Sequence, residues 1–537
     1  IATLMGLPGA RADELADLRA NQQLLEQRIN QLAAAQTAAG VPQQQAAVEG
    51  GPVVAGAPSL AGSFPRSFLI PGTNTSLAIS GYVKYDAEEW FQGGNPSVGS
   101  GGSDIYGLAA LAAAPLNLKG QPSIFAKVPS VTAAPAFNPA KRQYWVFHNT
   151  AAESRLRIET RTPTDLGQVG TVLEMDMQGC TTDGAICSNL NNGTFAELTR
   201  LRLAYATIGG FLAGQAFIPV NDNDAHPDLL DFSGDAGQFA FSRAPWIGYT
   251  WQLPYGTSFQ VAAVTPANIV ATPIGGITDG CNPATGLSGI SNCPAGSNGG
   301  FAINPAKTTM PDANFVFRAE QPWGHVQAGF VLQRLTWQDG ALINQNFIGY
   351  GGGLSWNWRP NWFGFSSKDN FGFNSFAGDG LGHYANPSGG GEPGTSNGLQ
   401  TNWGLVGVAC NTGTGVGCYG NTLGGAAAVT PQNAALVRTS TIPQRGVEIN
   451  YQHWWAPNWR STVSAGWQNN EYNLVLLGRN SNTLNYNRYL TTAHANIIWS
   501  PVSFIDTGFE YFFGERQTVL NQRGQINLLD YSFKVKF

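Results

Sequence analysis

The chain has 537 residues, a formal net charge of −5 and a pI of about 5.7, so it lacks the positive surface that a nucleic-acid partner requires. Charged residues make up only 12% and aromatic residues 11%, yet no apolar run approaches the roughly 18 residues that a membrane helix needs. This combination favours a transmembrane β-barrel, because alternating polar and apolar side chains dilute the hydropathy of each strand.

The first 72 residues differ in composition from the rest of the chain. Residues 1–12 are typical of the end of a secretory signal, an apolar stretch followed by the A-x-A pattern Ala10-Arg11-Ala12. Residues 40–72 are rich in Ala, Gly, Pro and Gln, which predicts a flexible linker. The barrel is expected over residues 73–537.

Residues 13–39 carry a seven-residue repeat that predicts a helix with an apolar stripe. Because such a stripe needs partners, we expect a parallel coiled coil between subunits, on the periplasmic side of the membrane. An isoleucine at a first heptad position, with leucines at the fourth positions, favours dimers. Two glutamines at first positions can fix the register and the number of chains in the coil, but they do not show what that number is. The repeat positions are Leu15, Leu18, Gln22, Leu25, Ile29, Leu32 and Gln36.

From Thr75 onward, apolar and polar residues alternate with a period of two, as in strands that face lipid on one side and water on the other. The pattern ends in residues 528–537, where Tyr531, Phe533 and Phe537 alternate with Asp530 and Ser532. It predicts about sixteen antiparallel strands, an even number as in bacterial barrels. They are placed near 75–91, 143–161, 169–179, 196–208, 210–218, 240–253, 257–268, 312–321, 324–337, 344–358, 361–376, 443–456, 459–472, 485–500, 503–516 and 525–537.

The connections between these strands alternate between short and long, which is typical of transmembrane barrels with short periplasmic turns and long outer loops. Tryptophans cluster beside the short connections, as expected for an aromatic girdle at the membrane interface. The short turns are 162–167, 254–256, 322–324, 360–361, 456–458 and 500–501, and the long loops are 92–142, 180–195, 219–239, 269–311 and 377–442.

Six cysteines fall as three local pairs, each inside one predicted outer loop. Pairing within each loop is the short-range choice in an oxidising compartment, and no C-x-x-C with a nearby histidine indicates a metal. We therefore expect three disulfides that stiffen surface loops, and neither a metal nor a cofactor. The expected disulfides join Cys180 with Cys187, Cys281 with Cys293, and Cys410 with Cys418.

The polar faces of the early strands carry many cations, which must point into the lumen because charges facing lipid cost several kcal/mol. The predicted basic wall of the pore consists of Lys84, Arg155, Arg157, Arg161, Arg200 and Arg202. Glu159, Glu174 and Asp176 lie among these arginines, so a neutral structural network is an equally good interpretation of the same pattern.

The loop at 219–239 is acidic and could fold back into the lumen. Its candidate constriction residues are Asp222, Asp224, Asp228 and Asp231. Arginines that face such a loop would create a transverse field that favours anions near the basic side.

Several motifs together resemble the DcaP-like trimeric porins. They are the runs at 70–77 and 81–84, the run at 153–167, Arg200-Leu201-Arg202-Leu203-Ala204-Tyr205-Ala206, the run at 211–215 and Asp231-Phe232-Ser233-Gly234. The resemblance implies a homotrimer of sixteen-stranded barrels in the bacterial outer membrane, in contact with lipid and lipopolysaccharide. It also implies a passive pore for small anions such as dicarboxylic or aromatic acids.

Two other functions fit parts of the pattern. A surface adhesin would use the cysteine-closed outer loops. A barrel lipase would use His453 and Ser461, which are predicted to lie opposite each other on the lipid face, but the sequence reveals no acid or amide beside His453 to orient it. No helix follows the glycines Gly349, Gly351, Gly352 and Gly353, so they indicate strand curvature or a packing contact in the barrel wall rather than a phosphate site. We therefore expect no enzymatic activity.

Overall fold

The computed structural model describes residues 61–92, 146–179, 198–231, 234–239, 241–266, 310–338, 344–360, 368–385, 438–473, 487–519 and 521–537, with Leu111 and the short pieces 116–117, 270–271, 277–278, 302–303, 306–307 and 405–408. The predicted signal remnant (1–12), the coiled coil (13–39) and most of the linker lie outside these residues.

The three predicted disulfides also fall outside the described residues, because none of the six cysteines is among them. No disulfide is therefore observed in the described part of the chain, and the three pairings stay predictions. The cysteines concerned are Cys180, Cys187, Cys281, Cys293, Cys410 and Cys418.

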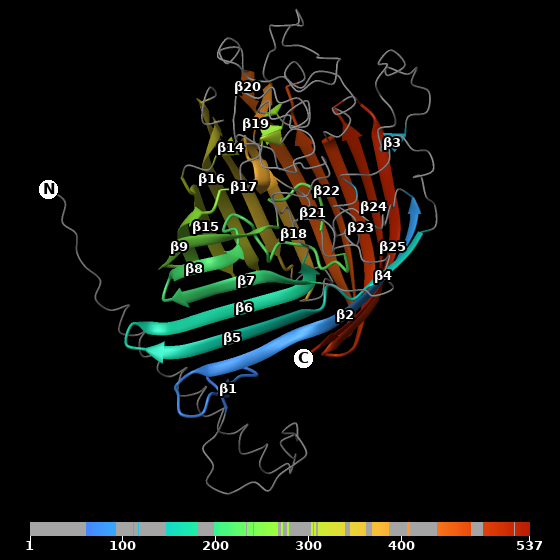
Figure 1. The fold of residues 1–537 in the computed structure, drawn as a ribbon. Helices are drawn as coiled ribbons and strands as arrows, with labels where there is room; N and C mark the ends of the chain where they lie inside the picture. The colour runs from blue at the N-terminus through green and yellow to red at the C-terminus, as the bar shows by residue number, and fades with distance from the viewer. Residues whose placement is uncertain are drawn as a thin grey trace, which may run out of the picture. The chain divides into compact units, whose positions relative to one another are not determined.

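Sixteen antiparallel strands form a closed barrel, as predicted (Figure 1). Each strand pairs with the next along the chain, and the last strand pairs with the first from Tyr82↔Lys536 onward, which closes the ring. In ring order they are β2 (Ser76–Gln92), β5 (Arg155–Thr164), β6 (Gly167–Gly179), β7 (Leu198–Ile208), β8 (Phe211–Phe217), β9 (Arg243–Leu253), β10 (Thr257–Val264), β15 (Asp312–Gln321), β16 (Gly324–Gln338), β17 (Asn344–Trp358), β18 (Asn370–Asp379), β21 (Pro443–Ala456), β22 (Trp459–Asn470), β23 (Asn487–Val502), β24 (Ile505–Thr518) and β25 (Arg523–Lys536).

Short elements add to this ring without changing it. They are β1 (Phe68–Leu69), β3 (Leu116–Asn117), β4 (Val146–Thr150), β11 (Val270–Ala271), β12 (Ile277–Thr278), β13 (Ala302–Ile303), β14 (Ala306–Lys307), the 3₁₀ turn Gly382–Ala385, β19 (Leu405–Val408) and β20 (Arg438–Thr441). No helix among the described residues is long and apolar enough to cross a membrane.

Two predicted strands differ from the observed ones, one by an interruption and the other by a later start. The strand expected over 143–161 is divided into β4 and β5, because Ser154 N–H donates to Ala151 O and turns the chain between them. Both pieces still pair with β2, β4 over Asp86–Trp90 and β5 over Ser76–Tyr82. The strand expected over 361–376 begins only at Asn370.

Residues 61–72, at the end of the predicted linker, pack onto the start of the first barrel strand. Phe68 and Leu69 pair with Leu77 and Ser76, and Ser63 N–H donates to Ser76 Oγ at 2.9 Å. The chain therefore enters the barrel along β2.

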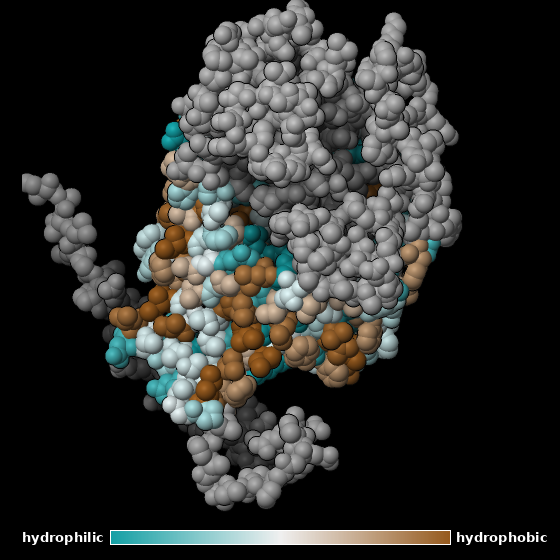
Figure 2. All heavy atoms as spheres, viewed as in Figure 1, coloured by the Kyte–Doolittle hydropathy of each residue, from teal (hydrophilic) through white to brown (hydrophobic). Residues whose placement is uncertain are grey.

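The two faces of the barrel wall differ in chemistry as the period of two requires. Large apolar side chains stay exposed on the outer face, among them Ile79, Val83, Ile449 and Phe509. Polar and charged neighbours such as Asp530 and Glu448 are buried on the inner face. Hydrophobic residues recur over the described part of the surface in Figure 2.

Tryptophans gather where strands meet the short turns. Trp323, Trp455, Trp459 and Trp499 are exposed at these strand ends, and the rings of Trp459 and Trp499 stack with centroids 5.7 Å apart. Amphipathic rings at this height are typical of the membrane interface.

The inner wall also carries apolar patches that hold the segment between β8 and β9. One cluster contains Ile218, Val220 and Phe239 from this segment together with Val331 and Phe376 from the wall. A Cβ at Gly353 would meet the ring of Phe239 at 2.5 Å, so this glycine of β17 leaves room for the ring. Gly353 thus serves wall packing, one of the two roles predicted for the glycines of β17.

Candidate functional site

The segment 218–242 is called here the inner loop, and its described residues, 218–231, 234–239 and 241–242, run along the inside of the barrel wall. In Figure 1 its green trace between β8 and β9 passes through the barrel interior. Its backbone carbonyls accept hydrogen bonds from wall side chains at Val220, Asp224, Ala225, Asp228 and Leu230. These donors come from β16, β17, β18, β23 and β2, so the loop is fastened to strands on several sides of the ring.

A glycine permits the closest approach of the inner loop to the wall. Gly237 has φ +95°, and a Cβ there would collide with the backbone carbonyl oxygens of Val447 and Trp467. Only glycine tolerates both the backbone angle and the contact.

Asp222 and Asp224, two of the predicted constriction acids, contact β15, β16 and β17. Arg318 lies between them, with Nη1 3.1 Å from Asp222 Oδ1 and Nη2 2.5 Å from Asp224 Oδ2. Asp222 also accepts hydrogen bonds from His325 Nε2 and Ser355 Oγ, each at 2.7 Å. Burial acts to raise the pKa of Asp222, but these hydrogen bonds and the charge of Arg318 lower it to about 2. Asp222 is therefore fully ionised at neutral pH.

Asp228 and Asp231, the other two predicted acids, lie further along the inner loop. Asp228 Oδ2 is 2.6 Å from Arg460 Nε and accepts a hydrogen bond from Gln452 at 2.9 Å. The backbone N–H of Asp231 donates to Glu510 Oε1 at 3.1 Å. All four acids thus lie on the inner loop, and three of them have ion pairs or carboxylate-binding neighbours on the wall.

His226 lies between these acids, with one ring nitrogen 3.0 Å from Asn221 Oδ1 and the other 4.0 Å from Glu448. Burial lowers the pKa of His226 to about 4, although Asp222 and Asp224 act in the opposite direction. The imidazole is therefore neutral at pH 7.

The predicted basic wall is brought together on β2, β5 and β7, with acids of β6 among its cations, but every member is ion-paired. Arg202, fully buried, lies 2.8 Å from Glu174 and 2.9 Å from Asp176. Lys84 Nζ contacts Glu153, Asp86 (3.1 Å) and Leu230 O (2.7 Å). The remaining pairs are Arg155 and Arg157 with Glu174, Arg157 and Arg161 with Glu159, and Arg200 with Asp176.

The five arginines share three carboxylates, Glu159, Glu174 and Asp176, and so keep two positive charges in excess. Lys84 faces two carboxylates, Glu153 and Asp86, which reduces the excess over all six predicted cations to one. Both interpretations of the sequence pattern are therefore partly realised: the side chains form a network, and the network is not neutral. Its most exposed members are Arg157 and Arg161, with 31% and 40% of their side-chain surface accessible.

Four cations of the opposite wall were not predicted from the sequence, namely Arg318, Arg359, Lys368 and Arg460. Arg318 alternates with Phe317 and Ala319 inside a predicted strand, and Arg460 alternates with Trp459 and Ser461. The same alternation that identified the basic wall could have placed these two in the lumen.

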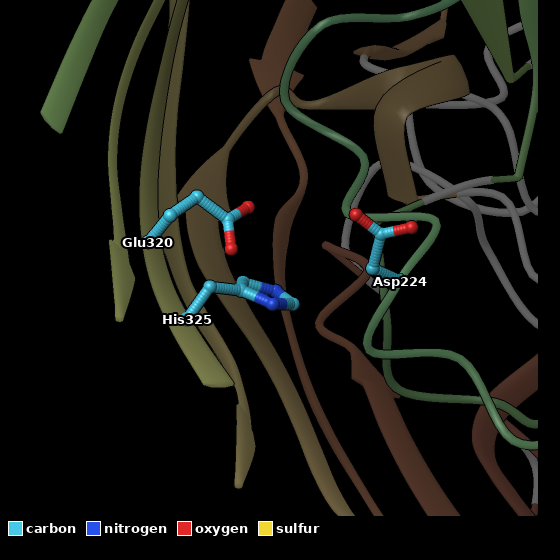
Figure 3. A group of neighbouring side chains, drawn as sticks. All are labelled: Asp224, Glu320 and His325. Carbon is cyan, nitrogen blue, oxygen red and sulfur yellow. The ribbon is translucent and has the colours of Figure 1, made fainter. Parts of the chain in front are cut away.

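Asp224, Glu320 and His325 are the one group among the described residues whose ligand atoms, all within 4.8 Å, could hold a metal ion. Figure 3 shows the two carboxylates turned toward each other, with the imidazole beside them. Arg318 already binds both carboxylates, at 2.5 Å from Asp224 and 2.5 Å from Glu320, and His325 Nε2 binds Asp222. A guanidinium thus supplies the positive charge that a metal would bring.

On the lipid face, the structure corrects one expectation. The register pairs His453 with Ser461 as predicted, but an acid does orient the histidine: Asp369 Oδ2 lies 2.9 Å from His453 Nδ1 and is itself fully buried. Asp369 also accepts the backbone N–H of Trp454 at 2.9 Å. It was missed because a long loop separates β18 from β21, and sequence alone does not fix the register between them. Ser461 Oγ accepts a hydrogen bond from Trp455 Nε1 at 3.0 Å. Ser461 and His453, both described residues, are not hydrogen-bonded to each other.

A closed antiparallel barrel with an apolar outer face and a polar interior, partly filled by a loop, defines an outer-membrane channel of the porin class. The protein is located in the bacterial outer membrane.

The comparisons with known proteins agree with this class. The family model described as DcaP outer membrane protein matches residues 438–535. The outer membrane channel DcaP of Acinetobacter baumannii is 18% identical over 86% of this chain and 97% of that chain, with a TM-score of 0.56. The predicted resemblance to the DcaP family is thereby confirmed.

Other solved structures are similar at lower scores. An anion-selective porin from Comamonas acidovorans is 8% identical over 86% of this chain and 100% of that chain, with a TM-score of 0.44. Salmonella typhi OmpF in complex with daunomycin is 9% identical over 86% and 98%, with a TM-score of 0.41. No curated protein matches the chain.

Proposed function

We propose that the channel is a passive diffusion pore for small hydrophilic solutes that prefers anions, such as dicarboxylic or aromatic acids. The observation that carries the proposal is the excess of two positive charges among five arginines and three carboxylates on β5, β6 and β7. Fixed charges lining a narrow aqueous path concentrate counter-ions and set ion preference.

The inner loop supports the same proposal through its position in the ring. Its acids contact strands from β15 to β22, which lie across the sixteen-stranded ring from β5, β6 and β7. A positive side facing a side with carboxylates creates a transverse field, and anions pass near the positive side. The predicted basic-wall and constriction residues enter the proposal in these roles.

The experiment is the reversal potential of single channels in a planar bilayer under a KCl gradient. The variant Arg157→Gln/Arg161→Gln removes the two most exposed cations and is expected to shift the reversal potential toward cation preference. The matched control is Arg445→Gln, an exposed arginine paired with Glu471 at 2.9 Å on β21. Unchanged selectivity in the double variant would refute the basic wall. Membranes that stay silent would instead favour an adhesin that uses its outer loops.

We also propose a homotrimer joined by the coiled coil at 13–39, supported by the heptad pattern and by the family resemblance. Deletion of residues 13–39 is expected to lower the yield of trimer on native gels while the barrel keeps its resistance to unfolding in SDS. Unaltered trimer yield would count against this role of the segment.

Lipid hydrolysis is a second candidate, favoured by one observation. Asp369, the residue before β18, lies beside His453 of β21, which pairs with Ser461 of β22, and exposed tryptophans at the membrane interface flank them. The acid and the histidine have the relation of two members of a catalytic triad, whereas Ser461 would have to rotate to reach His453. Release of fatty acid from phospholipid vesicles that stops in Ser461→Ala would support hydrolysis, and equal background release from both proteins would exclude it.

A further inference from the structure

The last strand carries two lysines that lie outside the predicted basic wall. Lys534 and Lys536 are on β25, which closes the ring against β2 (Figure 1), and their side chains are 26% and 39% accessible. Both lie within ion-pair distance of Asp506 of β24, which is buried on the inner face, so they point into the lumen. They are nearly as accessible as Arg157 and Arg161, the most exposed members of the arginine cluster.

The two lysines share their acid with a third cation, so this group of side chains is not neutral. Asp506 lies 2.6 Å from Lys536 Nζ, 3.7 Å from Lys534 Nζ and 3.6 Å from Arg460 Nη1. Arg460 also binds Asp228 of the inner loop, at 2.6 Å. Three cations therefore share two carboxylates, and one positive charge remains in excess.

The lysines lie beside the arginine cluster, with only β2 between them. Tyr82 of β2 is opposite Lys536 of β25 on one side and opposite Arg155 of β5 on the other. Since neighbouring strands are about 4.8 Å apart, the backbones of the two cation-bearing strands are roughly 10 Å apart. The centroid of the Tyr82 ring lies 5.1 Å from Arg155 Cζ and 5.7 Å from Lys534 Nζ. The two groups of cations therefore border the same uncharged strip of wall, formed by Tyr82 and Ser80.

The inner face of β2 and β25 changes in charge along its length. Lys84, which is opposite Lys534, is buried and ion-paired, and beyond this pair the acids Asp86, Glu88 and Asp530 follow toward the long loops. Each of these acids is at most 3% exposed. On these two strands, the charges within reach of a solute are therefore the two lysines at the end of β25 where the short turns are.

We propose that Lys534 and Lys536 are specificity-determining residues of the pore, which continue the positive side of the lumen from β5 across β2 to β25. The inference deepens the proposed function and rests on it, because it needs an aqueous path past these strands. Fixed charges that a passing ion can approach raise the local concentration of counter-ions. An anion meets cations on both sides of Tyr82, so the lysines add to the anion preference independently of the arginine cluster.

The test is the reversal potential of single channels of Lys534→Gln/Lys536→Gln under a KCl gradient. This variant changes the group from one positive to one negative charge in excess. The ratio of chloride to potassium permeability is expected to fall about threefold, the effect of one unit charge about 7 Å from an ion in water. Lys534→Arg/Lys536→Arg keeps both charges and should keep the wild-type reversal potential. Asp506→Asn should shift the reversal potential toward anions, and a shift of this opposite sign does not arise from impaired folding.

The salt concentration separates an effect of charge from a change in pore shape. The screening length is about 10 Å at about 0.1 M KCl and about 3 Å at about 1 M, so the shift in the lysine variant should be larger at the lower concentration. The matched control is Arg523→Gln, which removes an exposed arginine from the other end of β25, where it pairs with Glu515 at 3.2 Å. This control should leave the reversal potential unchanged.

An unchanged reversal potential in the lysine variant, or a shift of equal size at both salt concentrations, would overturn the role of the lysines. If Arg157→Gln/Arg161→Gln shifts the reversal potential and the lysine variant does not, the proposed pore stands without them. A wild-type channel that prefers cations would refute the proposed preference, yet a further shift toward cations in the lysine variant would still support the lysines. A silent bilayer would overturn both.

Discussion

The two sides of the barrel interior carry similar cations but use them differently. On β5, β6 and β7 the arginines are paired with carboxylates of the same strands, and Arg202 is fully buried among them. Across the ring, Arg318 and Arg460 are paired with acids of the inner loop, and Arg359 has no ion pair within the described part of the chain. The number of cations on a wall therefore does not give the charge that a solute meets, because the pairing partner decides it.

The largest expected effect comes from breaking the paired side. Glu174→Gln removes the carboxylate that binds Arg155, Arg157 and Arg202, which leaves buried Arg202 with Asp176 alone. The free energy of unfolding should fall by about 3–5 kcal/mol, the cost of breaking a buried pair. Urea unfolding in detergent micelles, followed by tryptophan fluorescence, measures it. Glu515→Gln, which breaks the exposed pair with Arg523, should cost less than about 1 kcal/mol. Equal losses of unfolding free energy in Glu174→Gln and Glu515→Gln would contradict the distinction between buried and exposed ion pairs.

A smaller effect is expected where the inner loop touches the wall on the other side. Gly237→Ala should displace the loop, because its Cβ would collide with two backbone carbonyls, of Val447 and Trp467, at a positive φ. Single-channel conductance should then change, since the loop occupies part of the lumen. Gly72→Ala is the matched control, with φ +77° and nothing within 4 Å of its Cβ. The positive φ alone costs about 1–2 kcal/mol in both variants, so a conductance change confined to Gly237→Ala isolates the contact.

The smallest effect concerns the pH dependence of the loop. The pKa of His226 is lowered to about 4 by burial, against about 6.5 for an exposed histidine. The displaced loop therefore binds more protons than the docked loop between pH 6.5 and 4. Docking should weaken as pH falls through this window, by up to about 1.4 kcal/mol per pH unit. Asp222, with a pKa of about 2 in the docked loop, stays ionised there throughout, and it adds to the weakening only at the acidic end of the window, where the carboxylate of a displaced loop begins to bind a proton.

Conductance recorded between pH 7 and 4.5 checks this prediction, and His226→Gln should flatten the profile. Glu448, whose carboxylate is 4.0 Å from His226, faces the same imidazole, so Glu448→Gln is the second variant to measure. A profile that His226→Gln leaves unchanged would assign the pH response to another group.

The barrel itself could be predicted from the sequence because a period of two is a local signal. Each of the sixteen predicted strands corresponds to an observed one, and the errors lie at ends such as Asn370, where no periodic residue marks the boundary. Even the family resemblance was carried by motifs between 70 and 234, while the family model matches 438–535. Both halves of the barrel therefore carry recognisable sequence.

The candidate site could be predicted only in part, because its pairings depend on residues far apart in the chain. Alternation placed Arg200 and Arg202 beside Glu174 and Asp176, which are on neighbouring strands. It could not pair Arg460 with Asp228, which are 232 residues apart, nor Asp369 with His453 across an 84-residue separation. Such pairs require the register of strands joined by long loops and the path of the inner loop.

The inner loop has a mechanical consequence for the cylinder that encloses it. The carbonyl of its Leu230 accepts a hydrogen bond from Lys84 of β2, and the N–H of Leu230 donates to Glu510 of β24. On the far side, its Asp222 carboxylate accepts from Arg318 of β15. Strands that no ladder joins directly are thus linked through the centre. Lateral pressure from lipid that would flatten an empty cylinder must first stretch these links, so the cross-section should stay round when membrane tension changes.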